Sequence, residues 1–354
     1  MTWEATLMAQ RGTRVGPSLR IPRRRKRLLA ALGIVTGVVV LGMVGALMFT
    51  EPRAALLRSL FEAGDSEAVE PGFTTISARV LVTPDVVVPV AGEPDASLDV
   101  YQPKQPAAGS LPLVLLVHGG GFISGNKGSI SEYATRLASE GYIVASVGYT
   151  LAPASVYPTP IRQVNAALRT FIDQSERYGG DPTRVFVGGD SAGAQIASQV
   201  AAVQSNPDLA AAMNLTPAVP ATALRGALLF CGLYNMATVS ATGFPGLETF
   251  MPTYLGQEDW ADAARIEELS TTSHVTPDYP PTLLVVGDAD PFESQAFELE
   301  QVLRGNGVDV ATQYWTGSGK NLGHEYQYLF TLPEAHSTFA ATLTFLAENS
   351  EEPG

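Results

Sequence analysis

The 354-residue sequence contains a single cysteine, Cys231, and only four histidines. One cysteine excludes an intramolecular disulfide and a thiolate metal cluster, and we interpret Cys231, which lies in an apolar run, as a small buried side chain. No group of histidines and carboxylates has the spacing of metal ligands, so we expect neither a metal nor another cofactor. The fold must therefore rest on core packing, for which a hydrophobic content of 45% is sufficient.

Basic residues are scarce beyond residue 58. Residues 1–58 carry ten Lys or Arg against Glu4 and Glu51, about +8, which leaves about −21 for the remainder of a chain whose net charge is −13. Because phosphate binding needs a basic surface, this distribution argues against a nucleic-acid partner. The sequence also lacks Gly-Lys-Ser/Thr and Gly-x-Gly-x-x-Gly, which argues against a glycine-rich loop that cradles phosphate.

Leu28–Phe49 is a run of 22 residues without a charge. As a helix it would span about 33 Å, the thickness of the hydrocarbon core of a bilayer. Five basic residues at 23–27 precede it, and such clusters stay cytoplasmic. We predict a basic cytoplasmic segment at 1–27, a transmembrane anchor at 28–49 and export of the remainder. The alternatives are secretion after signal cleavage, although the run is longer than a usual signal and ends in a poor cleavage site, and a buried core helix.

Residues 50–75 lack strong periodicity, so we predict a stalk with a short helix at 53–62, followed by one domain over 76–350. Strands are expected at 79–90, 98–101, 113–117, 142–147, 184–188, 226–231, 282–286 and 308–315, and helices at 129–140, 160–177, 192–204, 292–305 and 334–348. Strands that alternate with helices predict an α/β fold with a mostly parallel central sheet covered by helices on both faces. Residues 234–281 interrupt the alternation, and we expect either a helical lid over a pocket or an extension packed on the surface.

Ser191 lies between an expected strand and an expected helix. The segment around it reads Gly-x-Ser-x-Gly and includes Gly189, Asp190 and Gly193. In a nucleophile elbow the serine occupies a strained turn, the glycines let chain and helix approach closely, and the helix amino terminus faces the developing negative charge. The context therefore indicates a nucleophilic serine.

The segment His118-Gly119-Gly120-Gly121-Phe122 directly follows another expected strand. Successive glycines let backbone N–H groups turn toward one point, and acyl transfer needs such donors where a carbonyl oxygen becomes an oxyanion. We expect Gly120 and Gly121 to supply donors, and Ala192 to supply a third. His118 leads this loop, where we expect a structural role.

A serine hydroxyl near neutral pH needs a base to take its proton. His324 is our candidate, because it lies in a glycine-containing loop after the last strand, which can carry an imidazole over the sheet edge. His274 precedes the acid-bearing strand, and His336 falls in the last helix, where packing or exposure explains it.

The acid that orients the imidazole should follow a strand between the serine and the histidine in chain order. Gly-Asp-Ala-Asp-Pro at 287–291 offers two carboxylates. We choose Asp290, which is held by Pro291, over Asp288, whose alternative role is to form the turn. Glu293 is a third candidate.

Together these segments resemble the hormone-sensitive-lipase-like branch of the α/β-hydrolase esterases, over residues 97–348. The motifs are Leu-Asp-Val-Tyr-Gln-Pro (98–103), His-Gly-Gly-Gly-Phe (118–122), Gly-Tyr-Thr-Leu-Ala-Pro (148–153), Tyr-Gly-Gly-Asp-Pro-Thr-Arg-Val (178–185), Gly-Asp-Ser-Ala-Gly (189–193), Gly-Asp-Ala-Asp-Pro (287–291) and the histidine loop. The chain departs from the family pattern at Thr150, where an arginine is usual, at Gln163, where an aspartate is common, and at Glu325-Tyr326.

The resemblance implies a metal-free carboxylesterase or deacetylase for small to medium acyl esters, with Ser191, Asp290 and His324 as triad. The residues themselves predict two-step acyl transfer from a small-molecule ester. The same triad would also serve an amidase, formamidase or peptidase. A catalytically inactive binding module is the alternative from another class, although such proteins usually lose the nucleophile or the base, and both are present here.

Overall fold

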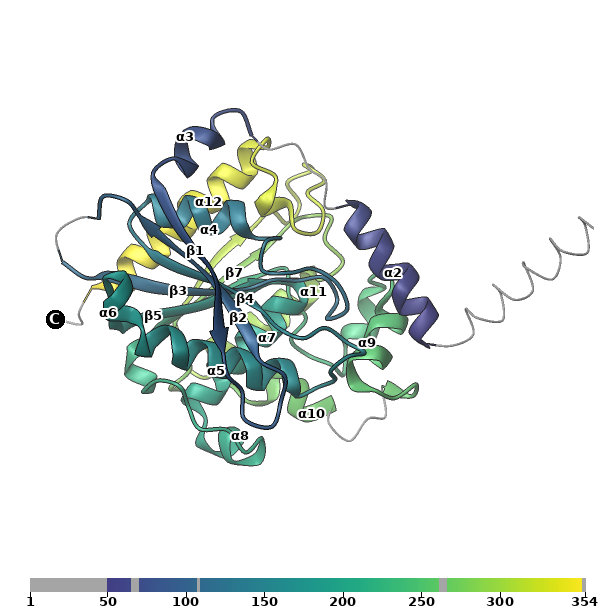
Figure 1. Ribbon diagram of the computed structural model, residues 1–354. Coiled ribbons are helices and arrows are strands. Elements are labelled where there is room, and N and C mark those ends of the chain that lie inside the picture. The colour runs from purple at the N-terminus through teal and green to yellow at the C-terminus, as the bar shows by residue number, and fades with distance from the viewer. Residues whose placement is uncertain (1–49, 65–69, 107–108, 261–265, 352–354) are drawn as a thin grey trace, which may run out of the picture. The chain divides into compact units, whose positions relative to one another are not determined.

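The computed structural model describes residues 50–64, 70–106, 109–260 and 266–351. Its sheet has eight strands in the order β1-β2-β4-β3-β5-β6-β7-β8 (Figure 1). The strands are β1 (Val80–Val88), β2 (Ala96–Pro103), β3 (Leu111–Val117), β4 (Ile143–Gly148), β5 (Gly180–Asp190), β6 (Leu224–Phe230), β7 (Thr282–Val286) and β8 (Val310–Tyr314). The β1–β2 and β2–β4 pairs are antiparallel, and every other pair is parallel. The expected mostly parallel sheet is confirmed.

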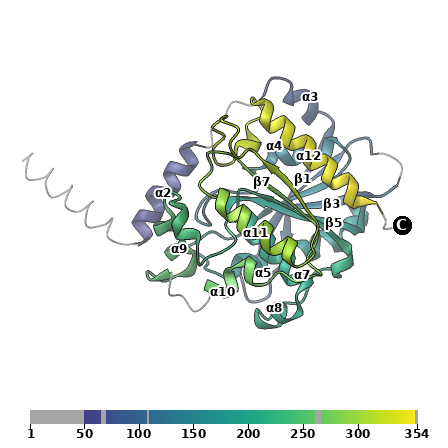
Figure 2. The ribbon, with the colours of Figure 1, turned by 180° about the vertical axis from the view of Figure 1, so that it is seen from behind.

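Helices cover both faces of this sheet. The larger ones are α2 (Thr50–Gly64), α4 (Ser131–Ser139), α5 (Thr159–Asp173), α7 (Ser191–Ser205), α9 (Leu247–Leu255), α11 (Glu293–Gly305) and α12 (Pro333–Ser350). The shorter ones are α3 (Phe73–Ser77), α6 (Ser175–Tyr178), α8 (Pro207–Ala212) and α10 (Ile266–Leu269). Core residues of α4 and α12 belong to one apolar cluster and those of α5, α7 and α11 to the other. Figure 2 shows α11 and α12 on opposite sides of β7.

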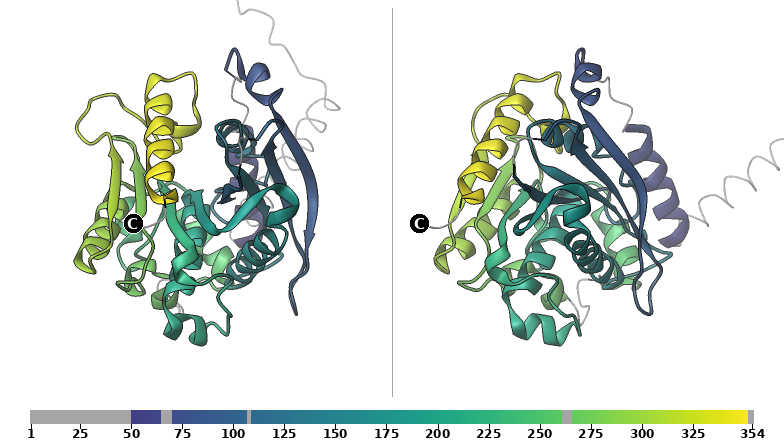
Figure 3. Two further views of the ribbon diagram at one scale, coloured as in Figure 1. Left: turned by 90° about the vertical axis from the view of Figure 1, so that its left-hand side faces the viewer. Right: turned by 60° about the vertical axis from the view of Figure 1, so that its left-hand side comes forward.

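The side chains of β3 show why both faces need cover. Leu113, Leu115 and Val117 pack into one cluster, and Val114 and Leu116 pack into the other. Successive side chains of a strand point to opposite faces, so an all-apolar strand buries both faces and belongs in the middle of a sheet. β1 and β8 form the two edges (Figure 3).

The parallel strands bring distant residues to one edge of the sheet. β3 leads into the loop at His118, β5 into Ser191, β7 into the segment that holds Asp290, and β8 into the loop that holds His324. Because the carboxyl ends of parallel strands meet at the same edge, this topology gathers the candidate residues, and such an edge is where open α/β sheets bind ligands.

The amino-terminal side of the domain differs from our expectation of a stalk at 50–75 followed by a domain from residue 76. The compact unit begins at Thr50, and α2 packs against α9 within it (Figure 1). The first two strands are antiparallel, and their register shifts between Thr83 and Val86, where Asp85 has a φ of 56°.

Residues 234–281 contain short helices, as expected for an insertion. Phe250, Met251 and Tyr254 of α9 are buried in the core cluster that also contains α7. The predicted cytoplasmic segment at 1–27 and the predicted anchor at 28–49 lie outside the described residues. Within the ranges described above, no helix combines the length and apolarity needed to cross a bilayer.

Candidate active site

The turn from β5 into α7 is built around glycine. Ser191 has a φ of 51°, the left-handed region in which a residue other than glycine is strained. A Cβ on Gly189 or on Gly193 would collide with the carbonyl oxygen of Val117. These two positions must therefore be glycine for the serine turn to lie against the end of β3, which places Ser191 beside the loop that begins at His118.

Three side chains from different loops meet at this turn. His324 Nε2 lies 2.9 Å from Ser191 Oγ, and His324 Nδ1 lies 2.9 Å from Asp290 Oδ2. Asp290 has a fully buried side chain, and its other oxygen accepts a hydrogen bond of 2.8 Å from the backbone N–H of Phe292. The structure thus joins hydroxyl, imidazole and carboxylate in one hydrogen-bonded chain.

Asp288, the alternative acid, has a different position. Its carboxylate accepts hydrogen bonds from Leu322 N at 2.7 Å, from Lys320 N at 2.9 Å and from Ser318 Oγ at 2.9 Å. Asp288 thereby holds the loop that carries His324, and does not contact the imidazole. Glu293 accepts a hydrogen bond from Thr316 Oγ1 and is likewise outside the chain of contacts.

The surroundings of His324 favour its charged form. Burial lowers the pKa of His324, but Cys231, followed by Asp290, raises it, and the net effect holds this pKa well above its usual value. Burial raises the pKa of the Cys231 thiol to about 11, so the thiol stays protonated near neutral pH. With the thiol neutral, the Asp290 carboxylate is the charge that stabilises the imidazolium formed when Ser191 gives up its proton.

Cys231, Asp290 and His324 are the one described group whose ligand atoms could hold a metal ion, and these atoms lie within 4.8 Å of one another. Both ring nitrogens of His324 are already engaged, one with Asp290 and the other with Ser191. A metal on this group would have to displace one of those contacts. In the structure, His324 contacts Asp290 and Ser191 instead.

The glycine-rich loop has backbone geometry suited to anion binding. Gly120 and Gly121 have φ values of 98° and 59°. Among the residues that the structure describes, their N–H groups donate to no carbonyl oxygen. Ala192 is the second residue of α7, and first-turn N–H groups have no partner within their helix. The N–H groups of Gly120, Gly121 and Ala192, which we expected to be oxyanion donors, are therefore available to a ligand.

Asp190 connects the loops that surround Ser191. Its carboxylate accepts a hydrogen bond from Gly119 N at 2.9 Å and another from Tyr328 Oη at 3.0 Å. Burial, followed by the adjacent Glu325 carboxyl, raises the pKa of Asp190 well above its usual value. The residue before the nucleophile thus holds the glycine-rich loop and the histidine loop together.

His118 is buried and stacks on Tyr149 with 4.3 Å between ring centroids. Its Nδ1 lies 2.8 Å from the carbonyl oxygen of Gly119, and burial lowers its pKa to about 4. A neutral, packed imidazole agrees with a structural role. His274 contacts a backbone carbonyl of the insertion, and His336 contacts Phe330, so neither reaches Ser191.

Sequence reasoning did not place Phe244 or Glu325 beside His324. Phe244, from the 234–281 insertion, lies 4.8 Å from the imidazole between ring centroids and stacks on Phe292. Glu325 has a φ of 61°, and its Oε1 lies 3.7 Å from His324 Nε2. Nothing local in the sequence predicts the Phe244 contact, whereas Glu325 was visible as a departure from the family pattern.

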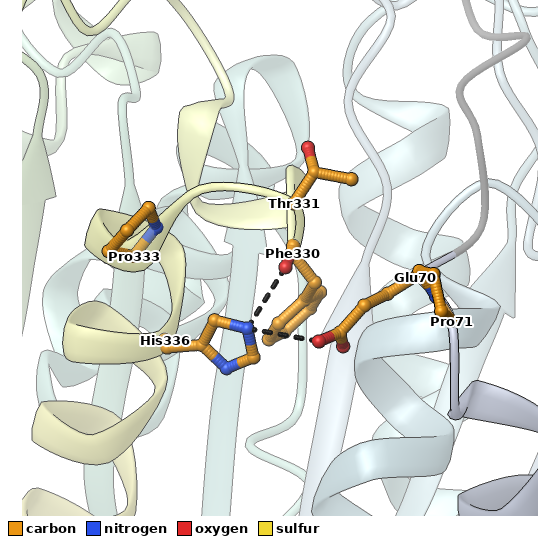
Figure 4. Close-up of a pocket in the computed structure, with 6 residues that line it drawn as sticks. All are labelled: Glu70, Pro71, Phe330, Thr331, Pro333 and His336. Carbon is orange, nitrogen blue, oxygen red and sulfur yellow. Dashed lines mark hydrogen bonds and ion pairs between the residues drawn. The ribbon is translucent and has the colours of Figure 1, made fainter.

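An open depression lies elsewhere, lined by Glu70, Pro71, Phe330, Thr331, Pro333 and His336 (Figure 4). His336 Nε2 faces both the carbonyl oxygen of Phe330, at 2.9 Å, and Glu70 Oε1, at 3.3 Å. None of the lining residues belongs to the hydrogen-bonded chain or to the glycine-rich loop. The depression is therefore separate from the candidate site.

Comparison with known proteins agrees with the fold. A family described as the alpha/beta hydrolase fold matches residues 114–324. The chain is 26% identical over 290 residues to the versiconal hemiacetal acetate esterase of Dothistroma septosporum. This match covers 77% of this chain and 82% of that protein. It is 25% identical over 196 residues to the probable carboxylic ester hydrolase LipM of Mycobacterium tuberculosis. This match covers 54% of this chain and 44% of LipM.

Among solved structures, esterase B from Lactobacillus rhamnosis superimposes with a TM-score of 0.74 at 24% identity, over 87% of this chain and 96% of the other. A bacterial heroin esterase gives a TM-score of 0.67 at 24% identity, over 84% and 91%. At this identity the two structures support the fold. The family model matches more than half of the chain and shows that the chain belongs to the hormone-sensitive-lipase-like family of the α/β-hydrolase fold, a family of carboxylic ester hydrolases.

Proposed function

We propose that the protein hydrolyses carboxylic esters with small to medium acyl chains through an acyl-enzyme intermediate on Ser191. The observation that carries the proposal is the hydrogen-bonded chain from Ser191 Oγ through His324 to Asp290, with 2.9 Å at each step. A nucleophile within hydrogen-bond reach of a base, which is itself oriented by a third group, is the arrangement that activates a hydroxyl.

In the first step Ser191 Oγ attacks the ester carbonyl while His324 Nε2 takes the hydroxyl proton. The buried Asp290 carboxylate orients the imidazole through Nδ1 and stabilises the imidazolium. The N–H groups of Gly120, Gly121 and Ala192 donate to the oxyanion of the tetrahedral intermediate, a contribution that is usually among the largest in acyl transfer. His324 then protonates the leaving alcohol.

In the second step His324 takes a proton from water, and the resulting hydroxide attacks the acyl-serine. The same oxyanion donors act again, and His324 returns the proton to Ser191 Oγ as the carboxylic acid leaves. No cofactor enters either step. The balance is one ester and one water consumed, and one acid and one alcohol released.

Aromatic side chains lie close to the proposed oxyanion donors and to the imidazole. Phe250 lies directly beside Gly121, Phe122 stacks on Tyr254, and Phe244 contacts the imidazole. An apolar wall beside the oxyanion donors favours an apolar acyl group. A panel of p-nitrophenyl esters of graded chain length measures where the preference lies.

The experiment that tests the proposed function compares Ser191→Ala with Ser198→Ala on p-nitrophenyl butyrate. Ser198 lies in the same helix, and its hydroxyl is hydrogen-bonded to the hydroxyl of Thr271. It is therefore a matched buried serine outside the site. We expect Ser191→Ala to lose at least about 10³-fold in kcat, and Ser198→Ala to keep most of its rate. Wild-type turnover by Ser191→Ala would overturn the assignment. The matching anilide measures whether amides are also cleaved.

For the amino-terminal segment we propose a signal anchor, with residues 1–27 cytoplasmic, residues 28–49 in the membrane and the catalytic domain extracytoplasmic. The support is the uncharged run at 28–49 and the basic cluster that precedes it. Protease added to intact cells should remove the catalytic domain from the membrane fraction. A domain that is protected there but digested after lysis would reverse the proposed orientation.

A further inference from the structure

Helix α2 uses one face to cover the catalytic edge of the sheet. Ala54 is fully buried, and Leu57 packs against Gly246. Arg58 donates through Nε to the carbonyl oxygen of Ile123 and through Nη2, at 2.9 Å, to that of Ala152. Phe61 lies beside Gly121, one of the expected oxyanion donors. α2 is therefore held directly against the glycine-rich loop.

The opposite face of α2 is apolar and exposed. Leu56 and Leu60, one turn apart, are 51% and 61% exposed. Ala55 and Ser59 are exposed between them, and the Ser59 hydroxyl is bonded to the carbonyl oxygen of Ala55, 3.1 Å away. The two leucines lie one above the other, because residues four apart share one face of a helix. Leu56 and Leu60 thus place two large apolar side chains in solvent on the outer face of α2.

The chain before α2 indicates what covers the exposed face. The uncharged run Leu28–Phe49 ends at the residue directly before Thr50, where α2 begins. In the proposed anchor, no linker residue separates the membrane-spanning run from Thr50, the first residue of α2. Apolar side chains of a helix that lies in the membrane interface insert about 5–10 Å into the headgroup boundary. Because the chain after residue 58 is acidic, it is not attracted to anionic lipid headgroups. Apolar contact must therefore supply the binding.

We propose that the outer face of α2, formed by Leu56 and Leu60, docks on the lipid bilayer, so that α2 lies between the membrane and the glycine-rich loop. The preferred substrates are then esters that partition into the bilayer. This inference rests on the proposed function, and it specifies from which phase that site receives its substrate.

The first test measures contact with lipid in the full-length chain, reconstituted at one copy per nanodisc. Leu60→Cys is labelled with an environment-sensitive fluorophore, and Leu81→Cys is the matched control, since Leu81 is 49% exposed on the edge strand β1. Cys231 is buried and should not react. Quencher-bearing lipids should quench the label at 60 at least about threefold more than the label at 81. Equal quenching at the two positions would overturn the proposal.

The second test separates docking from catalysis. In the same nanodiscs, Leu56→Glu/Leu60→Glu should lose about tenfold in kcat/KM on a p-nitrophenyl decanoate held in the bilayer, and should keep its rate on water-soluble p-nitrophenyl acetate. Leu81→Glu should change neither rate. An unchanged decanoate rate in the double variant overturns membrane docking. Failure of the proposed function would show as acetate hydrolysis that persists in Ser191→Ala. Failure of docking would show only on the decanoate, so the two failures are distinguishable.

A second copy of the chain is the other occupant to consider. At one chain per disc it is excluded, so quenching at position 60 under these conditions supports lipid. In detergent, a spectral shift at position 60 that grows with protein concentration, without lipid quenching in nanodiscs, would assign this face to self-association and overturn the proposal.

Discussion

The Asp190 carboxylate accepts a hydrogen bond of 2.9 Å from the backbone N–H of Gly119. This contact joins the residue before the nucleophile to the loop that carries the proposed oxyanion donors. The second oxygen of Asp190 accepts from Tyr328 Oη at 3.0 Å, so the histidine loop is held by the same side chain. The position of the donors relative to Ser191 therefore depends on one buried carboxylate.

Asp190→Ala should lower both stability and activity, because it leaves Gly119 N–H and Tyr328 Oη without an acceptor. An unsatisfied buried donor costs about 1–3 kcal/mol, so we expect a loss of about 2–5 kcal/mol in the free energy of unfolding. We also expect kcat/KM to fall at least tenfold. Asp190→Asn keeps one acceptor oxygen and should lose less of both. Chemical denaturation and ester hydrolysis on both variants measure this, and wild-type values for Asp190→Ala would contradict the bridging role.

The raised pKa of His324 predicts activity at alkaline pH. The base acts only when it is neutral, and a raised pKa keeps the imidazole protonated to higher pH, so kcat/KM should rise with pH through an apparent pKa above 6.5. Asp290→Asn removes a carboxylate that favours the charged ring, and should shift this apparent pKa downward while lowering kcat by about 10³–10⁴-fold. A pH–rate profile of each enzyme gives both quantities. An Asp290→Asn profile with an unchanged or higher apparent pKa would argue against the contact.

Glu325 should tune the same base from the other side. Its carboxylate lies 3.7 Å from His324 Nε2 and is partly exposed, so it favours the imidazolium less than the buried Asp290 does. Glu325→Gln should move the apparent pKa of kcat/KM downward by less than Asp290→Asn does. Glu325→Asp, which keeps the charge, is the control. A larger shift from Glu325→Gln than from Asp290→Asn would reverse the order of the two carboxylates.

Close packing at the serine turn predicts a strong contrast between two glycines. A Cβ on Gly193 would collide with the Val117 carbonyl oxygen, so Gly193→Ala should destabilise the domain by about 2–3 kcal/mol and remove most activity. A Cβ on Gly323, next to His324, would meet nothing within 4 Å. Gly323→Ala should therefore be tolerated. Thermal unfolding of both variants provides the comparison, and equal melting temperatures would refute the packing argument.

Much of the candidate site was predictable because its glycines and its serine leave local signatures. A strand followed by Gly-Asp-Ser-Ala-Gly restricts the backbone strongly, and the order of strands fixes which loops share an edge. The choice between Asp288 and Asp290 was harder, since both lie in one short loop. Only the structure shows that Asp288 accepts from the backbone of Leu322 whereas Asp290 reaches the imidazole.

The features that were missed depend on contacts between residues far apart in the sequence. The inner face of α2 contains Arg58, a charge that weakens the apolar periodicity, and its partners at Ile123 and Ala152 are 65 and 94 residues away. The contact of Phe244 with His324 also joins distant segments. A local hydrophobic pattern reports which residues are buried, but not which segment buries them.

Covalent labelling with a fluorophosphonate, mapped by peptide mass spectrometry, tests most directly whether Ser191 is the nucleophile. An activated serine reacts with this probe, and an ordinary serine does not. We expect one equivalent of label on Ser191, none on Ser191→Ala, and strongly slowed labelling on His324→Ala. Label on a different serine, or none on the folded wild-type protein, would contradict it.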